Sequence, residues 1–424
     1  PPPPPPPPPP TYPPPPPPPT NPHVLSSAAS DVYKRQTQFR LAFRRPGYAG
    51  EWGRGTVRFG LRGCTACGLE EFMSHPVSYR VVGNVGVVTI DNPPVNAFSL
   101  AVRKGLNDTI RDAIADDSGI ILIAWAGRTF VAGADISEFG EPPEDRWLPE
   151  VLDNIENSPK PVVPAVPGTA LGGGFELVLA SHYRCALASA KVGLPEVHLG
   201  LLPGAGGTQR TPRLAGVEAA LELMTSGRPI PAGKAQAAGL IDEVFDDDLE
   251  GNALRWCEQL LADGKGPVKV SEKAVPQVDA AVFDGARQLL AKRARGQLAP
   301  FRIVDCVEAA TRLPYPQGAE FEREQFAECM ASPQSAAMRH LFFAERQAAK
   351  FRDLPKDTSL RNIRSVAVIG AGTMGGGIAM SCANVGIPVK FLEVDAAALE
   401  RGFGVIEGNY AKTGKKGRLS QEEA

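Results

Sequence analysis

The chain has 424 residues and a mass of 45.0 kDa, which is room for two or three domains at roughly 100–200 residues each. Its net charge of -2 and pI of about 6.3 argue against a nucleic-acid-binding protein, which normally gathers basic residues on one face. No run of about 18 apolar residues occurs, so the sequence predicts no membrane span. The 7 cysteines are scattered, which favours a reducing compartment.

The first part of the chain lacks the patterns of a folded domain. Proline fills 18 of the first 22 positions, and such a tract forms a polyproline II rod or stays disordered. Residues 23–72 show no sustained helical or strand period, and the first methionine is Met73. We interpret residues 1–72 as disordered, non-native sequence upstream of the true start. A proline-rich ligand for an SH3-type groove is the alternative.

Between residues 77 and 265, short apolar runs alternate with helical patterns. Residues 79–82 and 85–90 alternate around Gly83-Asn84, which predicts a two-residue hairpin. The unbroken apolar run 120–125 predicts a strand that is covered on both faces. Further strands are expected at 161–166, 183–188 and 191–194, and helices at 100–114, 175–180, 216–225 and 234–239. This recurrence predicts stacked α/β units.

The pattern changes to long helices after the core, and residues 336–350 are the most periodic of them. Residues 365–369 then form a short β run that enters a glycine loop, followed by an expected helix at 376–385 and strand at 388–392. The predicted organisation is an α/β domain at 73–265, a helical linker at 266–362 and the start of a second α/β domain at 363–424.

Two stretches of small residues, 132–134 and 172–174, would let a ligand approach bare backbone amides. Two amides that converge on one oxygen form an oxyanion hole, and a helix N-terminus strengthens it. Glu176 and Glu196 lie in otherwise apolar sequence. If both face one pocket, burial and repulsion push their pKa values apart, which suits one as acid and the other as base. Each feature alone also fits tight packing or a helix dipole.

Together these features resemble the enoyl-CoA hydratase/isomerase (crotonase) family over residues 77–265. The motifs that carry the resemblance are AGADI at 132–136, GGGFEL at 172–177, LPE at 194–196 and PGAGGTQR at 203–210. The resemblance implies a stacked ββα fold, an oxyanion hole on the amides of Ala134 and Gly173, and catalytic residues Glu176 and Glu196. It also places four residues near the coenzyme A (CoA) moiety, namely Arg128, Ala132, Asp135 and Ile136.

The implied reaction is hydration of trans-2-enoyl-CoA to 3-hydroxyacyl-CoA in fatty-acid β-oxidation. Glu176 would activate a water for attack at C3, and Glu196 would supply the proton at C2. Two alternatives stay open: a Δ3–Δ2-enoyl-CoA isomerase, which needs one carboxylate, and a non-catalytic acyl-CoA-binding module. The 5 histidines show no metal-ligand spacing, so no metal is expected, and His198 is interpreted as structural.

A second constellation begins at Val366, where GxGxxG stands between an expected strand and helix. This context is typical of dinucleotide binding, with the pyrophosphate at the helix N-terminus and an acidic residue on the adenine ribose. Glu393 fits that acidic position and favours NAD over NADP, and Asp395 is the competing candidate. The segment resembles the Rossmann NAD-binding domain of 3-hydroxyacyl-CoA dehydrogenase, which implies NAD contacts at Gly370, Gly372, Met374, Gly375 and Glu393.

About 60 residues cannot complete a six-stranded Rossmann sheet. We therefore expect a truncated gene product without dehydrogenase activity, whose parent would oxidise 3-hydroxyacyl-CoA with NAD. The expected ligands are acyl-CoA thioesters, with no nucleic acid and no membrane span. The resemblance also points to a thiolase partner or to self-association, with a monomer or dimer favoured. A bacterial-type cytoplasm is the default location, and a peroxisomal one stays open.

Overall fold

The structure is a computed structural model that describes residues 76–93, 96–127, 129–131, 148–348, 355, 357–359 and 361–415. The chain divides between Phe72 and Met73, and all described residues belong to the second unit. The disorder predicted for residues 1–72 lies outside the described residues. No helix within the described ranges is long and apolar enough to cross a membrane.

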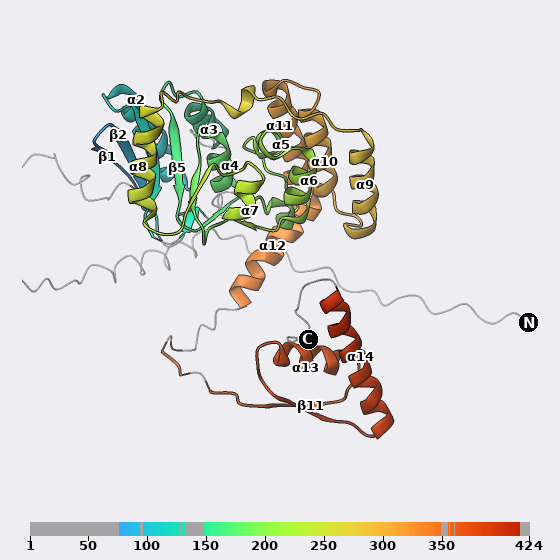
Figure 1. Ribbon diagram of the computed structural model, residues 1–424. Coiled ribbons are helices and arrows are strands. Elements are labelled where there is room, and N and C mark those ends of the chain that lie inside the picture. The colour runs from blue at the N-terminus through green and yellow to red at the C-terminus, as the bar shows by residue number, and fades with distance from the viewer. Residues whose placement is uncertain are drawn as a thin grey trace, which may run out of the picture. The chain divides into compact units, whose positions relative to one another are not determined.

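Two sheets build the core (Figure 1). The larger sheet has the strand order β1-β2-β3-β5-β7-β10, and the smaller has the order β4-β6-β8-β9. The strand bounds are β1 Val77–Val82, β2 Val85–Ile90, β3 Ile120–Trp125, β4 Thr129–Val131, β5 Val162–Val166, β6 Thr169–Leu171, β7 Cys185–Leu187, β8 Lys191–Gly193, β9 Ile230–Pro231 and β10 Glu243–Phe245.

The chain alternates between these sheets. β4 follows β3, β6 follows β5 and β8 follows β7, so each passage adds one strand to each sheet. The strands β4, β6 and β8 are parallel neighbours, as are β3, β5 and β7. Helices connect successive passages: α2 (Leu100–Ala115), α3 (Leu148–Glu156) and α4 (Gly173–Ala180). This is the predicted stacked ββα arrangement.

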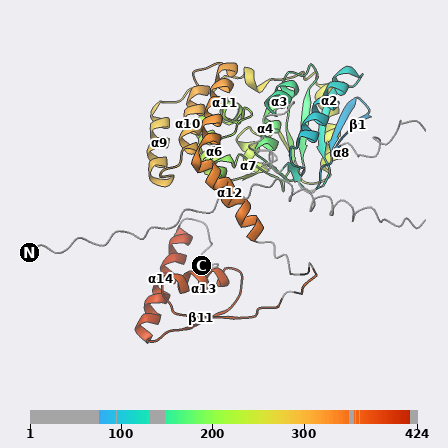
Figure 2. The ribbon, with the colours of Figure 1, turned by 180° about the vertical axis from the view of Figure 1, so that it is seen from behind.

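Strand β3 is covered on both faces, as its unbroken apolar run predicted. Ile121 and Ile123 join the main core cluster, whereas Ile120 and Leu122 join a second cluster. The second cluster includes residues of helix α8 (Leu249–Ala262), which packs on β3 and β5. Figures 1 and 2 show α8 on one face of the sheet and α2 and α3 on the other. The predicted hairpin is also confirmed, because Val82 pairs with Val85 in antiparallel register.

The helices that follow residue 266 share a core with the sheets. Ile303, Val304 and Val307 are fully buried in the main cluster. Helix α10 packs on α5 and α6, helix α11 packs on α5, and helix α12 packs on the short 3-10 helix η2. The bounds of these helices and of the helices that precede them from residue 196 onwards are η2 Glu196–Leu199, α5 Gly207–Ala215, α6 Val217–Ser226, α7 Ala232–Ala237, η3 Val270–Glu272, α9 Ala281–Arg293, α10 Ala299–Ala310, α11 Tyr315–Ala331 and α12 Pro333–Ala348.

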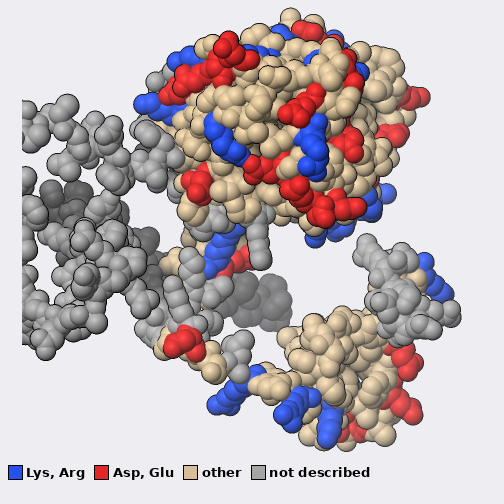
Figure 3. Space-filling view, turned by 60° about the vertical axis from the view of Figure 1, so that its left-hand side comes forward, with Lys and Arg blue, Asp and Glu red and all other residues tan. Residues whose placement is uncertain are grey.

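The C-terminal segment forms a strand–helix–strand–helix unit of its own. Its elements are β11 (Val366–Ile369), α13 (Thr373–Ala383), β12 (Val389–Leu392) and α14 (Ala396–Lys415). The two strands are parallel, with Val366 opposite Val389. The order and bounds agree with the predicted Rossmann start to within three residues. Acidic and basic side chains are interspersed over the face of the core seen in Figure 3.

Candidate active site

The glycine triplet at 172–174 opens helix α4, and each glycine has its own structural reason. Gly172 is the N-cap with φ of 53°, a conformation that favours glycine. A Cβ on Gly174 would lie 2.5 Å from the Cβ of Val131, so glycine is what lets α4 approach strand β4. Gly173 is the first helical residue, where an amide has no intrahelical partner. Its N–H can therefore serve a ligand oxygen.

The second predicted oxyanion donor, Ala134, lies outside the described residues. The predicted CoA contacts lie outside them too, namely Arg128, Ala132, Asp135 and Ile136. In the sequence, Ala134 comes three positions after strand β4 and Gly173 two positions after β6, and these two strands are parallel neighbours. All five residues stay predictions.

Glu176 lies in the first turn of α4 and is buried. Its Oε1 accepts hydrogen bonds from the amides of Ala205 (2.7 Å) and Gly207 (2.9 Å). Burial raises the pKa of Glu176, while these two amides and the Arg210 guanidinium oppose the rise. The two amides and the guanidinium thus favour the ionised form, which is the form that a general base needs, against the effect of burial.

Glu196 begins helix η2 and differs from Glu176 in its surroundings. Its Oε2 is buried and has no hydrogen-bond partner among the described residues. Burial raises the pKa of Glu196 well above the ordinary value, and the negative charges of Glu176 and Glu322 raise it further. The charge of Glu176 acts on the pKa of Glu196, so the two predicted glutamates lie near one another, and the direction of this shift favours the protonated form that a general acid needs.

The PGAGGTQR segment forms the support for Glu176. Arg210 is 1% exposed, and its guanidinium makes an ion pair with Glu156 at 2.7 Å. The same guanidinium donates to the Ala205 carbonyl at 2.9 Å and lies over the ring of Tyr315. Arg210, a residue of α5, thus holds the carbonyl of Ala205. This contact fixes the turn that presents the amide of Ala205 to Glu176.

Sequence reasoning missed a further buried carboxylate beside the site. Glu322 of helix α11 is 1% exposed, and it accepts hydrogen bonds from the amides of Gly206 (2.6 Å) and Thr208 (2.9 Å). Its neighbours Glu320 and Glu324 are exposed. No feature of the sequence separates the buried glutamate from the exposed ones, because burial here depends on a contact 116 positions away in the chain.

The glycine loop of the C-terminal unit has the expected local geometry. Gly370 has φ of 94°, and a Cβ on Gly375 would lie 1.9 Å from the carbonyl oxygen of Gly370. Gly372 is the N-cap of α13, and Met374 beside it is 80% exposed. These positions leave the helix N-terminus open to a phosphate.

The two acidic candidates at the end of β12 have different partners. The carboxylate of Glu393 accepts a hydrogen bond from the amide of Ala371, in the glycine loop, at 2.7 Å. Asp395 instead accepts from the amide of Ala398 at 2.6 Å and so caps helix α14. The contact with the glycine loop favours Glu393 as the residue for the adenine ribose.

Two family models match this sequence. The model described as enoyl-CoA hydratase/isomerase matches residues 80–278, and the model described as 3-hydroxyacyl-CoA dehydrogenase, NAD binding domain, matches residues 365–424. Residues 80–278 thus form an enoyl-CoA hydratase/isomerase domain. The resemblance drawn from the sequence motifs is thereby confirmed, as is the Rossmann start.

The curated relatives of this chain include proteins named as bifunctional or multifunctional enzymes. It is 41% identical over 346 residues to the peroxisomal bifunctional enzyme of Danio rerio, covering 80% of this chain and 48% of the relative. It is 35% identical over 356 residues to the peroxisomal fatty acid beta-oxidation multifunctional protein MFP2 of Arabidopsis thaliana, covering 80% and 49%. The chain thus spans about half the length of these curated relatives.

A solved structure of carnitinyl-CoA hydratase from Mycobacterium avium is 31% identical, with a TM-score of 0.48, and the match covers 66% of this chain and 100% of that one. The curated relatives carry peroxisomal and glyoxysomal names. The bacterial-type cytoplasm that we took as the default therefore has no support among them.

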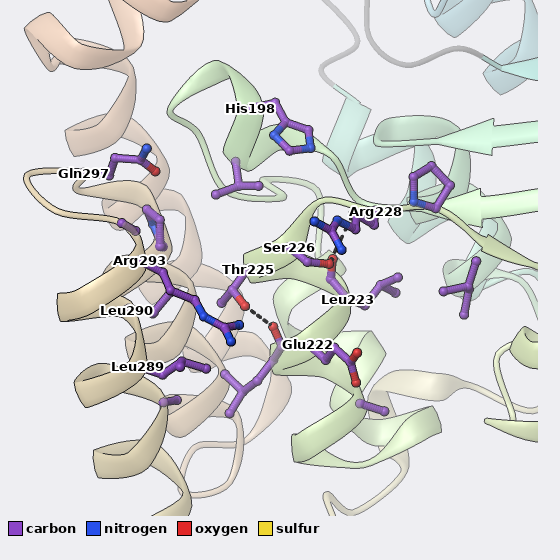
Figure 4. Close-up of a pocket in the computed structure, with 18 of the residues that line it drawn as sticks. His198, Glu222, Leu223, Thr225, Ser226, Arg228, Leu289, Leu290, Arg293 and Gln297 are labelled. Atoms are coloured by element: carbon purple, nitrogen blue, oxygen red, sulfur yellow. Dashed lines mark hydrogen bonds between the residues drawn. The ribbon is translucent and has the colours of Figure 1, made fainter. Parts of the chain in front are cut away.

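A cavity of about 1050 Å³ is lined by Val197 and His198, the two residues that follow Glu196. Figure 4 shows Glu222 of α6 and Arg293 of α9 among the side chains that line it. His198, interpreted from the sequence as a structural residue, is exposed at this cavity. The element that carries Glu196 therefore also borders an open space.

Proposed function

We propose that the core of this chain hydrates trans-2-enoyl-CoA thioesters to 3-hydroxyacyl-CoA in fatty-acid β-oxidation. The observation that carries the proposal is the pair of neighbouring glutamates with unequal electrostatic support. Glu176 is held by two amides, whereas Glu196 has an unpartnered buried oxygen among the described residues. One general base and one general acid are what hydration of a double bond requires.

The proposed mechanism assigns one role to each group. The thioester oxygen accepts from the amide of Gly173 and from that of Ala134, which stabilise the enolate charge by about 3–4 kcal/mol per donor. Glu176 takes a proton from a water whose oxygen attacks C3. Glu196 gives its proton to C2, and both carboxyl groups later exchange protons with solvent. The CoA contacts proposed for this substrate are Arg128, Ala132, Asp135 and Ile136.

The direct test is the loss of enoyl absorbance when the full chain is added to crotonyl-CoA. No loss at micromolar enzyme would overturn the proposal. The second candidate is Δ3–Δ2-enoyl-CoA isomerisation, and the observation that favours it is the unpartnered Oε2 of Glu196, since one carboxylate can move a proton between C2 and C4. A non-catalytic acyl-CoA-binding module has no need of either buried carboxylate.

Replacing Gly207 by alanine is expected to displace the base. A Cβ there would lie 2.6 Å from the Cβ of Pro203 and 2.8 Å from Oε1 of Glu176, which the Gly207 amide also binds. Because a shift of about 1 Å in a reacting group costs on the order of 10²-fold, we expect kcat for crotonyl-CoA to fall by about 10²-fold with little change in KM.

The matched control for this substitution is Gly233→Ala. A Cβ at Gly233 would meet nothing within 4 Å, so its kcat should equal that of the wild type. A wild-type kcat in Gly207→Ala, measured by the same absorbance assay, would show that the Gly207 amide does not hold the base during turnover.

The C-terminal unit is proposed to contact NAD through Gly370, Gly372, Met374, Gly375 and Glu393. We expect no NADH above background when this 424-residue polypeptide is given 3-hydroxybutyryl-CoA and NAD, as followed by NADH absorbance or fluorescence. Dinucleotide binding uses two βαβ halves, and the described part of this unit has the strands β11 and β12. Turnover above background would refute the expectation.

The names of the relatives support a peroxisomal location for this chain, which imaging of a fluorescent fusion of the full-length protein against a peroxisomal marker would test. The thiolase partner and the self-association stay predictions.

A further inference from the structure

We propose that Glu322 is a positioning residue for the catalytic pair. It binds alternate amides of the turn at residues 205–208 and so orients the two amides that hold Glu176. The proposal rests on the proposed function, because positioning has meaning only for a group that reacts. Glu322 lies outside residues 80–278, the part that the hydratase family model matches.

The hydrogen bonds of the turn alternate between two carboxylates. The amides of Ala205 and Gly207 donate to Glu176. The amides of Gly206 and Thr208 donate to Glu322, and the Thr208 hydroxyl also contacts this carboxylate. Four consecutive amides are thus divided between a residue of α4 and a residue of α11. A movement of either carboxylate must turn the backbone that the other one binds.

Close packing leaves this turn little room to rearrange. A Cβ on Gly204 would lie 2.5 Å from the ring of Phe326, and a Cβ on Gly318 would lie 2.1 Å from Oε1 of Gln209. Gly206 has φ of 94°, and a Cβ there would lie 2.7 Å from the hydroxyl of Tyr315. Glycines on both sides therefore let side chains pack directly against the backbone where α11 meets the segment that supports the base.

Glu322 is also electrostatically linked to the acid. Its charge raises the pKa of Glu196, and burial together with the charge of Glu176 raises the pKa of Glu322 to about 8. The hydrogen bonds from the turn oppose that rise. The titratable or charged groups that surround these carboxylates are Glu176 on α4, Glu196 on η2, Arg210 on α5, Cys306 on α10 and Tyr315 on α11. A change of charge at Glu322 therefore alters the pKa of Glu196.

Two substitutions at Glu322 separate the effect of side-chain length from the effect of negative charge. In Glu322→Gln, one carboxylate oxygen is replaced by an NH₂ group, which cannot accept from the second amide, and the negative charge is lost. In Glu322→Asp the charge stays, but the side chain is one methylene shorter and cannot reach both amides. The matched control is Glu324→Gln, an exposed glutamate on the same helix.

The experiment measures kcat, KM and the pH profile of crotonyl-CoA hydration for the full chain and these variants. We expect Glu322→Gln and Glu322→Asp to lower kcat about tenfold or more, with KM nearly unchanged. Glu322 is ionised above its pKa of about 8, and there its charge raises the pKa of Glu196, so the loss of that charge in Glu322→Gln should move the alkaline limb to lower pH. The limb of Glu322→Asp should stay in place, and Glu324→Gln should match the wild type.

Two results would overturn the proposal: wild-type kinetics in Glu322→Gln, or equal loss in both Glu322 variants with an unmoved alkaline limb. Backbone amide exchange gives an answer that does not depend on turnover. Exchange should accelerate at Ala205 and Gly207 as well as at Gly206 and Thr208 in Glu322→Gln. Unchanged exchange at Ala205 and Gly207 would refute the positioning role, whereas an inactive wild type would refute the hydration proposal instead.

Discussion

Glu196→Gln is expected to lower kcat for crotonyl-CoA hydration by about 10³-fold, because a positioned acid contributes about 10²–10⁴-fold and glutamine has no proton to give. KM should change little, since the substituted side chain keeps its size. The measurement is the initial rate of absorbance loss with purified full-length protein. The exposed Glu218 supplies the control, and Glu218→Gln should retain the wild-type rate.

The pH profile of the wild type gives the same role an independent check. Activity that needs a protonated group is lost as the pH rises through the pKa of that group. We therefore expect Glu196 to set the alkaline limb of the kcat/KM profile. Burial and the charges of Glu176 and Glu322 raise that pKa, which extends activity to higher pH than an ordinary carboxyl would allow. An alkaline limb that survives in Glu196→Gln would assign the donated proton to another group.

Glu176→Gln is expected to separate the two reactions that the site could perform. Hydration should fall by about 10³-fold, because the base that activates water is gone. Isomerisation of a 3-enoyl-CoA, if the site supports it through Glu196, should survive, because one carboxylate suffices. The glutamine oxygen can still accept from the amides of Ala205 and Gly207, so the turn keeps its partner.

Both reactions are measured on the same preparation of this variant, with crotonyl-CoA for hydration and trans-3-hexenoyl-CoA for isomerisation. Hydration by Glu176→Gln at more than about one tenth of the wild-type rate would contradict the assignment of the base. Equal loss of both reactions would mean that Glu176 serves a step that they share.

The fold was largely predictable because its signals are local. The run 120–125 has no polar position, and a strand between two apolar layers is the structure that satisfies it. The turn at Gly83-Asn84 was likewise predictable, because the residues of the turn themselves favour its conformation. The packing of the helices after residue 266 was not predictable, because their apolar faces fit several partners. The buried set Ile303, Val304 and Val307 becomes part of the main core only through tertiary contact.

The glutamate pair was predictable because both members lie in short motifs with small neighbours. Their unequal electrostatic support was not, since it comes from amides of Ala205 and Gly207 and from Arg210, all distant in sequence from Glu176. Glu322 is the extreme case, because it looks like any other glutamate of a surface helix until the turn at 205–208 is placed against it.

The shared core of sheets and linker helices has a consequence for what counts as one unit of this protein. The match to the hydratase family model ends at residue 278, yet ten buried residues of the main core cluster, from Phe283 to Cys329, come after it. A gene fragment cut there would expose the apolar surface that these ten residues cover and would leave two buried turn amides without an acceptor. We therefore expect that an expressed hydratase fragment needs the helices through α11 to keep its interior covered.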